Sequence, residues 1–111
     1  SLADIKSLVK LHLSFAKIYE LPQRVGQLVK LKSLKLRHCH KMKKLPDSIG
    51  TMKSLVELDL SESGIIQLPA TIGMLKTLEI VHARGCESLE EIPSTIGGCT
   101  SLRDLDLGYC D

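Results

Sequence analysis

The strongest constraint on the fold of this chain is a repeat of 23 to 24 residues. An aliphatic-proline dipeptide recurs at steps of 24, 23 and 24 residues, as Leu21-Pro22, Leu45-Pro46, Leu68-Pro69 and Ile92-Pro93. Hexads of the form L-x-x-L-x-L begin at Leu8, Leu31, Leu55, Leu78 and Leu102, and leucine fills thirteen of their fifteen aliphatic slots. Because a fixed period decides the architecture by itself, the chain is predicted to be a solenoid of stacked units.

Each unit combines two different periods. Alternation within L-x-L puts two leucines of each hexad on one face of a short strand. The segment after each proline gives inward-facing residues at three-residue spacing, as in Ile49, Met52 and Leu55, which indicates a helical turn or an extended run. Proline itself fits the first helical position. The predicted fold class is therefore α/β: a curved parallel β-sheet on the concave side, with short helical or extended segments on the convex side.

This pattern resembles the leucine-rich repeat across nearly the whole chain. The form L-P-x-x-I-G-x-L-x-x-L, with cysteine at the ninth position of the 24-residue units, is most similar to the repeats of plant intracellular immune (disease resistance) receptors that carry a nucleotide-binding domain. Plant repeats of the intracellular Ras group usually have asparagine at that position. Repeats of plant cell-surface receptor kinases usually combine asparagine with a G-x-I-P segment.

We predict one array over residues 1–111. It consists of a partial repeat 1–7, the complete repeats 8–30, 31–54, 55–77 and 78–101, and a partial repeat 102–111. Solenoids usually end in polar caps that cover the last core layer, and neither end carries one. We therefore expect the chain to be part of a longer solenoid.

The candidate partner-binding residues are the polar and aromatic side chains at and just after the strands, where repeats of this kind generally bind. On the concave and lateral faces they are His12, Phe15, Lys35, Arg37, His38, Asp59, Glu62, His82, Arg84, Asp106 and Tyr109. Phe15 and Tyr109 are plausible interface anchors, since aromatic side chains often dominate binding energy. A position of Phe15 partly under its neighbours is the alternative.

Charge is unevenly distributed along the chain. Residues 1–53 contain twelve Lys or Arg and three Asp or Glu, whereas residues 54–111 contain three and ten. Residues 30–44 contain seven basic residues and no acidic one. The predicted basic docking patch consists of Lys30, Lys32, Lys41, Lys43 and Lys44, because a field of one sign can steer an oppositely charged partner. The alternative is a solvated surface that keeps a leucine-rich stack soluble.

The function implied by the resemblance is protein–protein interaction. In such a receptor the repeats sense a ligand, a pathogen effector or a host protein, and hold the neighbouring nucleotide-binding domain in its closed state. The alternative is a free-standing intracellular leucine-rich repeat scaffold or signalling adaptor of the Ras-group type. The chain has no asparagine and hence no N-glycosylation acceptor, and its four cysteines lack paired spacing. An intracellular location, cytoplasmic or nuclear, is therefore expected, with no membrane contact.

Other chemistry receives little support from the sequence. No nucleotide-binding loop is present, and the carboxylate pairs Glu57 with Asp59 and Asp104 with Asp106 alternate along open strands. A dyad of His82 with Cys39 or Cys86 would lack an enclosed site. Nucleic-acid binders usually add aromatic platforms to basic charge, and no aromatic residue lies within residues 30–44. We expect no enzyme activity, no cofactor and no nucleic-acid partner.

The run His38-Cys39-His40 could pass for a metal site. In register, however, Cys39 occupies the ninth position of its repeat, equivalent to Cys86 and Cys110, where a small side chain is expected to point inward. Three consecutive residues cannot easily surround one tetrahedral ion. We therefore predict a structural corner and no metal site, with a weak His38 and His40 surface pair as the alternative.

Overall fold

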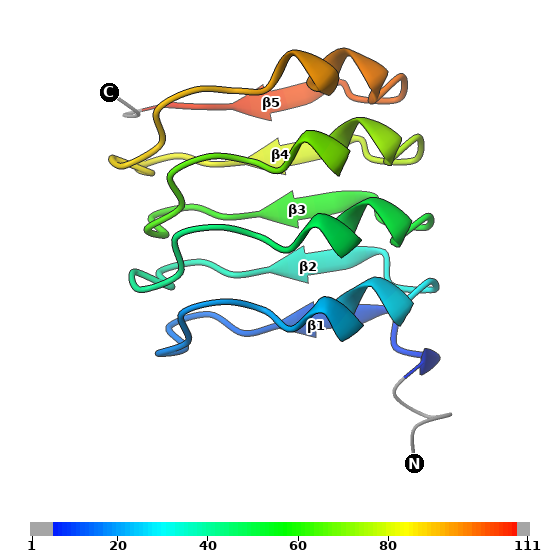
Figure 1. Ribbon diagram of the computed structural model, residues 1–111, viewed down its shortest axis with the longest axis horizontal. Helices are drawn as coiled ribbons and strands as arrows, with labels where there is room; N and C mark the ends of the chain where they lie inside the picture. The colour runs from blue at the N-terminus through cyan, green and yellow to red at the C-terminus, as the bar shows by residue number, and fades with distance from the viewer. Residues whose placement is uncertain (1–5, 109–111) are drawn as a thin grey trace.

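The computed structural model describes residues 6–108 and shows five short strands in one parallel sheet, in the order β1-β2-β3-β4-β5 (Figure 1). The strands are β1 (Lys10–His12), β2 (Ser33–Lys35), β3 (Glu57–Asp59), β4 (Ile80–His82) and β5 (Asp104–Asp106). One 3-10 helix lies between each pair of successive strands: η1 (Gln23–Gln27), η2 (Asp47–Thr51), η3 (Ala70–Met74) and η4 (Ser94–Gly98). The predicted leucine-rich repeat solenoid is confirmed, whereas the exact repeat boundaries stay a prediction.

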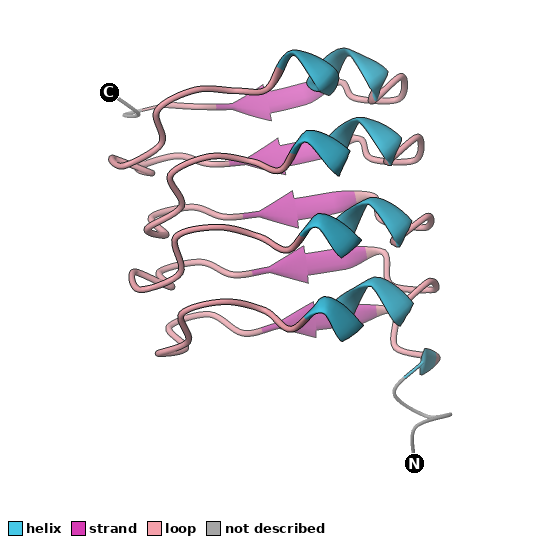
Figure 2. Cartoon of the chain, viewed as in Figure 1, coloured by secondary structure: helices cyan, strands magenta, loops and turns pink. Residues whose placement is uncertain are grey.

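The register of the sheet follows directly from the hexads. The central residue of each hexad pairs with its equivalent in the next strand, as Leu11 with Leu34 and Leu34 with Leu58; in the fourth hexad this residue is Val81. In the middle repeats these side chains and the inward residues Met52 and Leu55 are fully buried. The 3-10 helices lie over one face of the sheet (Figure 2). The buried aliphatic side chains of successive repeats form one continuous core cluster.

Each 3-10 helix begins just after a proline. Pro22, Pro46, Pro69 and Pro93 have extended backbone angles and occupy the N-cap, one position earlier than the sequence suggested. The carbonyl group of the proline accepts the first helical hydrogen bond, as from the backbone N–H of Val25 to Pro22 at 3.0 Å. Proline therefore serves the turn because its carbonyl group is needed and its missing N–H is not.

In this architecture the amino ends and the carboxyl ends of the strands lie at opposite lateral edges of the molecule. The carboxyl ends of all five strands lead into turns along one lateral edge of the molecule, on the left in Figure 1, and the amino ends lie at the other edge. Within the described residues, no helix has the length and apolar character needed to cross a membrane.

Candidate interaction surface

The candidate residues on the strands themselves form a row across the sheet. His12 is exposed, whereas Lys35, His82 and Asp106 are half-buried. Asp59 differs from this group, since only 5% of the residue is exposed although the sequence placed it on the open surface. Its burial results from the neighbours that its carboxylate binds.

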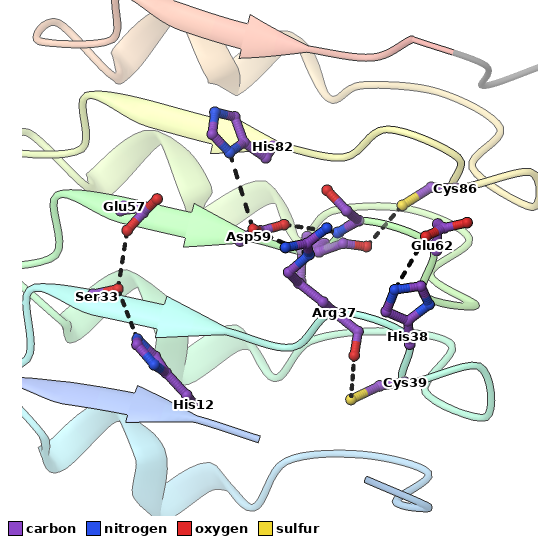
Figure 3. Close-up of polar contacts among 12 residues, drawn as sticks. His12, Ser33, Arg37, His38, Cys39, Glu57, Asp59, Glu62, His82 and Cys86 are labelled. Carbon is purple, nitrogen blue, oxygen red and sulfur yellow. Dashed lines mark hydrogen bonds and ion pairs between the residues drawn. The ribbon is translucent and has the colours of Figure 1, made fainter. Parts of the chain in front are cut away.

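Asp59 fixes the strand end of its own repeat and a side chain of the preceding one. Its Oδ1 accepts a hydrogen bond from the backbone N–H of Ser61 at 3.0 Å, and its Oδ2 lies 3.7 Å from Nε of Arg37 (Figure 3). A carboxylate that bonds the backbone two residues ahead favours a tight turn at this point.

The same arrangement recurs two repeats later. Asp106 accepts from the backbone N–H of Gly108 at 3.0 Å and lies 3.7 Å from Nη1 of Arg84. Arg37 and Arg84 are therefore both positioned by an aspartate of the following repeat.

Polar side chains also connect neighbouring strands. Ser33 donates a hydrogen bond to Glu57 at 3.1 Å, and His12 Nε2 lies 3.4 Å from the Ser33 hydroxyl. His82 lies 4.0 Å from Asp59 (Figure 3) and, on its other side, 3.7 Å from Asp104. The polar face of the sheet is thus a linked network.

The residues just beyond these strand ends share an unusual backbone conformation. Phe15, His38 and Glu62 have φ angles of 65°, 60° and 58°, and Gly85 at the equivalent position has 72°. His38 stacks on Phe15 with ring centroids 4.3 Å apart, and its Nε2 lies 3.1 Å from Glu62 Oε2. Phe15 is 70% exposed, and the His38 ring covers one of its faces. Its role as an interface anchor stays a prediction. Tyr109 lies outside the described residues.

Three of the candidate residues surround one hollow. Arg37, Glu62 and Arg84 line a space of about 280 Å³ whose other lining residues are the small Ser61 and Gly85. Both signs of charge are present, because the two arginines are matched by Glu62 and by Asp59 and Asp106 nearby. The hollow therefore suits a polar segment of a protein better than an isolated anion.

The basic residues predicted as one patch fall into two groups. All five are exposed, but Lys30 and Lys32 precede β2, whereas Lys41 ends the turn that follows β2, and Lys43 and Lys44 lie between that turn and η2. Lys41 lies beside Tyr19 of the preceding repeat, whereas Lys44 lines a space with Pro22 and Pro46 at the starts of η1 and η2. Contiguity in sequence hid this division, since a strand separates the two groups in space.

One contact at this edge could not be found from the sequence. Lys41 Nζ lies 5.6 Å from the centre of the Tyr19 ring, and Tyr19 is 69% exposed. No aromatic residue lies within residues 30–44. The preceding repeat, however, places Phe15 beside His38 and Tyr19 beside Lys41. We call Phe15, Tyr19, His38 and Lys41 the aromatic edge.

The cysteines serve the interior of the array. Cys39 donates through its thiol to the Leu13 carbonyl group at 3.2 Å, and Cys86 donates to that of Leu60 at 2.9 Å. Both are fully buried at the ninth position, as predicted for a structural corner. Burial raises the pKa of the Cys99 thiol, although Lys76 acts in the opposite direction. Cys99 therefore remains a protonated thiol at neutral pH, which is a poor nucleophile.

Within residues 6–108, no group of three or more His, Cys, Asp or Glu side chains has an arrangement that could hold a metal ion. The rings of His38 and His40 are 6.0 Å apart and nearly perpendicular. His82, considered as the partner of a thiol, lies instead between Asp59 and Asp104. The absence of catalysis, metal and cofactor stays a prediction.

Comparison with known proteins agrees with this architecture. The family model for the leucine-rich repeat region matches residues 21–111 of this sequence. The chain therefore belongs to the leucine-rich repeat family. Leucine-rich repeat domains are protein–protein interaction modules, and the open polar surface described above is consistent with that role. A search among curated proteins found no match.

Solved structures give three informative neighbours. The leucine-rich repeat domain of the type III effector XopL has a TM-score of 0.85 at 24% identity, with 98% of this chain and 40% of that chain covered. A leucine-rich repeat protein of Leptospira interrogans has a TM-score of 0.62 at 27% identity, covering 96% and 33%. The plant peptide hormone receptor RGFR1, solved in complex with RGF2, has a TM-score of 0.63 at 30% identity, covering 95% and 21%. This chain therefore spans less than half the length of each neighbour.

Proposed function

We propose that this chain is the ligand-sensing and autoinhibitory repeat region of a plant intracellular immune receptor. The first repeats dock on the neighbouring nucleotide-binding domain, and a pathogen effector or a host protein disturbs that contact. The motif form supports this proposal, because the ninth-position thiols and the L-P-x-x-I-G segments resemble that group of repeats. RGFR1 in complex with RGF2 is a plant precedent for a ligand bound to a protein with such repeats.

The observation that supports the interaction role most directly is the excess of positive charge in the first repeats. Residues 8–46 contain ten Lys or Arg and one acidic residue, Glu20. Lys41, Lys43 and Lys44 present part of this charge between the turn after β2 and the start of η2, outside the core. Such a field raises the rate at which an acidic surface is found and selects its orientation.

Charge reversal of these three lysines tests the docking role. The variant Lys41→Glu/Lys43→Glu/Lys44→Glu should weaken binding to the nucleotide-binding domain of the same polypeptide by about tenfold or more at 150 mM salt. Lys35 and Arg37 are left unchanged, since Lys35 pairs across the sheet with Asp59 and Arg37 lies 3.7 Å from it. A glutamate at either position would disturb folding as well as binding.

The matched control is Lys30→Glu/Lys32→Glu/Lys53→Glu. It makes the same change in net charge with three exposed lysines that precede their strands. Surface plasmon resonance should show a much smaller loss for this control than for the edge variant. Equal affinities of the edge variant and the unmodified chain would exclude docking through this edge.

The complete coding sequence separates this proposal from the free-standing scaffold or adaptor. A nucleotide-binding domain with its phosphate-binding loop upstream of the repeats supports the receptor role. A polypeptide made of repeats alone supports the scaffold and removes the autoinhibitory part of the proposal.

A further inference from the structure

The position after each strand end makes an unusual demand on the backbone. Phe15, His38, Glu62 and Gly85 stand at equivalent places in four successive repeats, and all have φ between 58° and 72°. This left-handed region is open to glycine but is disfavoured for other residues, most of all for bulky ones. Gly85 shows that the fold is satisfied without a side chain here. The side chains of the other repeats therefore require another explanation.

Burial does not explain Phe15. The residue is 70% exposed, so its ring gives the core little of the apolar burial that normally offsets backbone strain. Non-glycine residues in strained conformations concentrate at functional sites, where the conformation aims a side chain. Here the conformation directs an aromatic ring outward from the lateral edge.

The ring is held in place by the next two repeats. The imidazole of His38 stacks on one face of Phe15 at 4.3 Å and an interplanar angle of 5°. Glu62 in turn pairs with His38 at 3.1 Å (Figure 3). Such ordering before binding reduces the entropy that a partner must remove. Phe15 is thus a preorganised contact residue.

The surroundings specify the charge of the partner. Tyr19 is 69% exposed, and Nζ of Lys41 lies 5.6 Å from the centre of its ring. The exposed charged residues of the two turn segments here are the basic Lys17, Arg37, Lys41 and Lys43 and the acidic Glu20 and Glu62, and Glu62 is already paired with His38. A segment lying on this edge meets exposed aromatic rings within a positive field, so acidic residues beside an apolar one complement it.

We propose that the aromatic edge binds an acidic protein segment that places one aromatic or large aliphatic side chain against Phe15. The proposal rests on the interaction role given above and specifies the chemistry of the partner. Phe15 supplies the apolar contact, His38 and Glu62 hold it, and Lys41 with its neighbouring lysines binds the carboxylates.

A single-stranded nucleic acid fits this edge less well. The basic region covers two repeats, which are one strand spacing of about 4.8 Å apart. Single-strand sites usually extend over about 4 to 16 nucleotides. A strand that continued along this edge would next meet the exposed carboxylate of Glu62.

Peptide selection tests the proposal without a known partner. A random twelve-residue phage-display library is selected on the 111-residue chain. The expected consensus has several Asp or Glu around one Trp, Phe, Tyr or Leu. A consensus without acidic residues, one without a large apolar residue, or no consensus at all would overturn the proposal.

The consensus peptide is then titrated against Phe15→Gly by fluorescence anisotropy. Glycine suits the left-handed backbone, so the variant is expected to fold, and circular dichroism verifies this. Affinity should fall by about tenfold or more, as for an aromatic hot spot. An affinity within threefold of the unmodified chain would overturn the proposal even if charge reversal of the edge lysines abolishes domain docking, which keeps the two proposals separable.

Two further arms identify other occupants. Fluorescein-labelled dT12 should bind at least tenfold more weakly than the peptide, and tighter dT12 binding that depends on Phe15 would assign the edge to nucleic acid instead. Sedimentation of the unmodified chain should show no self-association that depends on Phe15. Self-association that is lost in Phe15→Gly would assign the edge to a second copy of the chain. Phe15→Ala serves as the stability control: Phe15→Gly should melt about 4 °C higher, and the reverse order would remove the strain argument.

Discussion

At the scale of single residues, the same side chain can make the same contacts in two repeats and still differ in burial. Asp59 is buried and holds both Arg37 and the Ser61 backbone, whereas its equivalent Asp106 makes the same contacts with 34% of its side chain exposed. His12 and Lys35 occupy the same place in the first two repeats. Because burial and not residue type decides the energetic role, equal substitutions should have unequal effects.

Asp59→Ala should lower the free energy of unfolding by about 2 kcal/mol. The substitution leaves the buried Ser61 N–H without its acceptor and separates Arg37 from its carboxylate. Urea denaturation followed by circular dichroism measures the loss. Asp106→Ala is the matched control and should cost about 0.5 to 1 kcal/mol, because water replaces the lost contacts there. Equal losses for the two variants would show that burial of Asp59 has no energetic consequence.

At the scale of the repeat elements, the glycine of each 3-10 helix allows close stacking. A methyl group added to Gly73 would lie 2.3 Å from the Thr95 carbonyl oxygen of the next repeat, and one added to Gly26 would lie 2.5 Å from that of Ser48. At Gly97 the same addition would meet no atom within 4 Å. The glycine therefore matters only where another repeat packs against it.

Gly73→Ala should destabilise the array by about 1 to 3 kcal/mol, because the added methyl forces two repeats apart. Gly97 also follows a Thr-Ile pair in its 3-10 helix, and Gly97→Ala should be neutral or slightly stabilising, since alanine restricts the unfolded chain. Thermal unfolding of the two variants compares them directly. A similar loss at both positions would place the effect within the 3-10 helix and exclude packing between repeats as its cause.

The elements also show what a repeat pattern can predict. Period and hexads predict strand order, register and the inward leucines, because every repeat must bury the same positions against its neighbour. The start of each 3-10 helix was displaced by one residue, since proline contributes a carbonyl acceptor as the N-cap. The burial of Asp59 could not be predicted, because it depends on which side chains the adjacent repeats supply.

At the scale of the whole molecule, the array brings together residues that are distant in sequence. The aromatic edge combines Phe15 and Tyr19 of one repeat with His38 and Lys41 of the next. Residues 30–44 contain no aromatic residue, and only the stacking of the repeats brings Phe15 beside His38 and Tyr19 beside Lys41. Conversely, Lys30 and Lys32 are close to Lys41 in sequence but lie before β2 and not on the edge.

The central claim is that the interior positions build the solenoid while the lateral edge of the first two repeats binds protein. The most direct test is a titration of the ¹⁵N-labelled chain with the selected acidic peptide, followed by NMR. We expect the largest amide shifts at residues 14–19 and 37–41, with little change in η1 to η4. Largest shifts on the 3-10 helices, or at β4 and β5, would contradict the central claim.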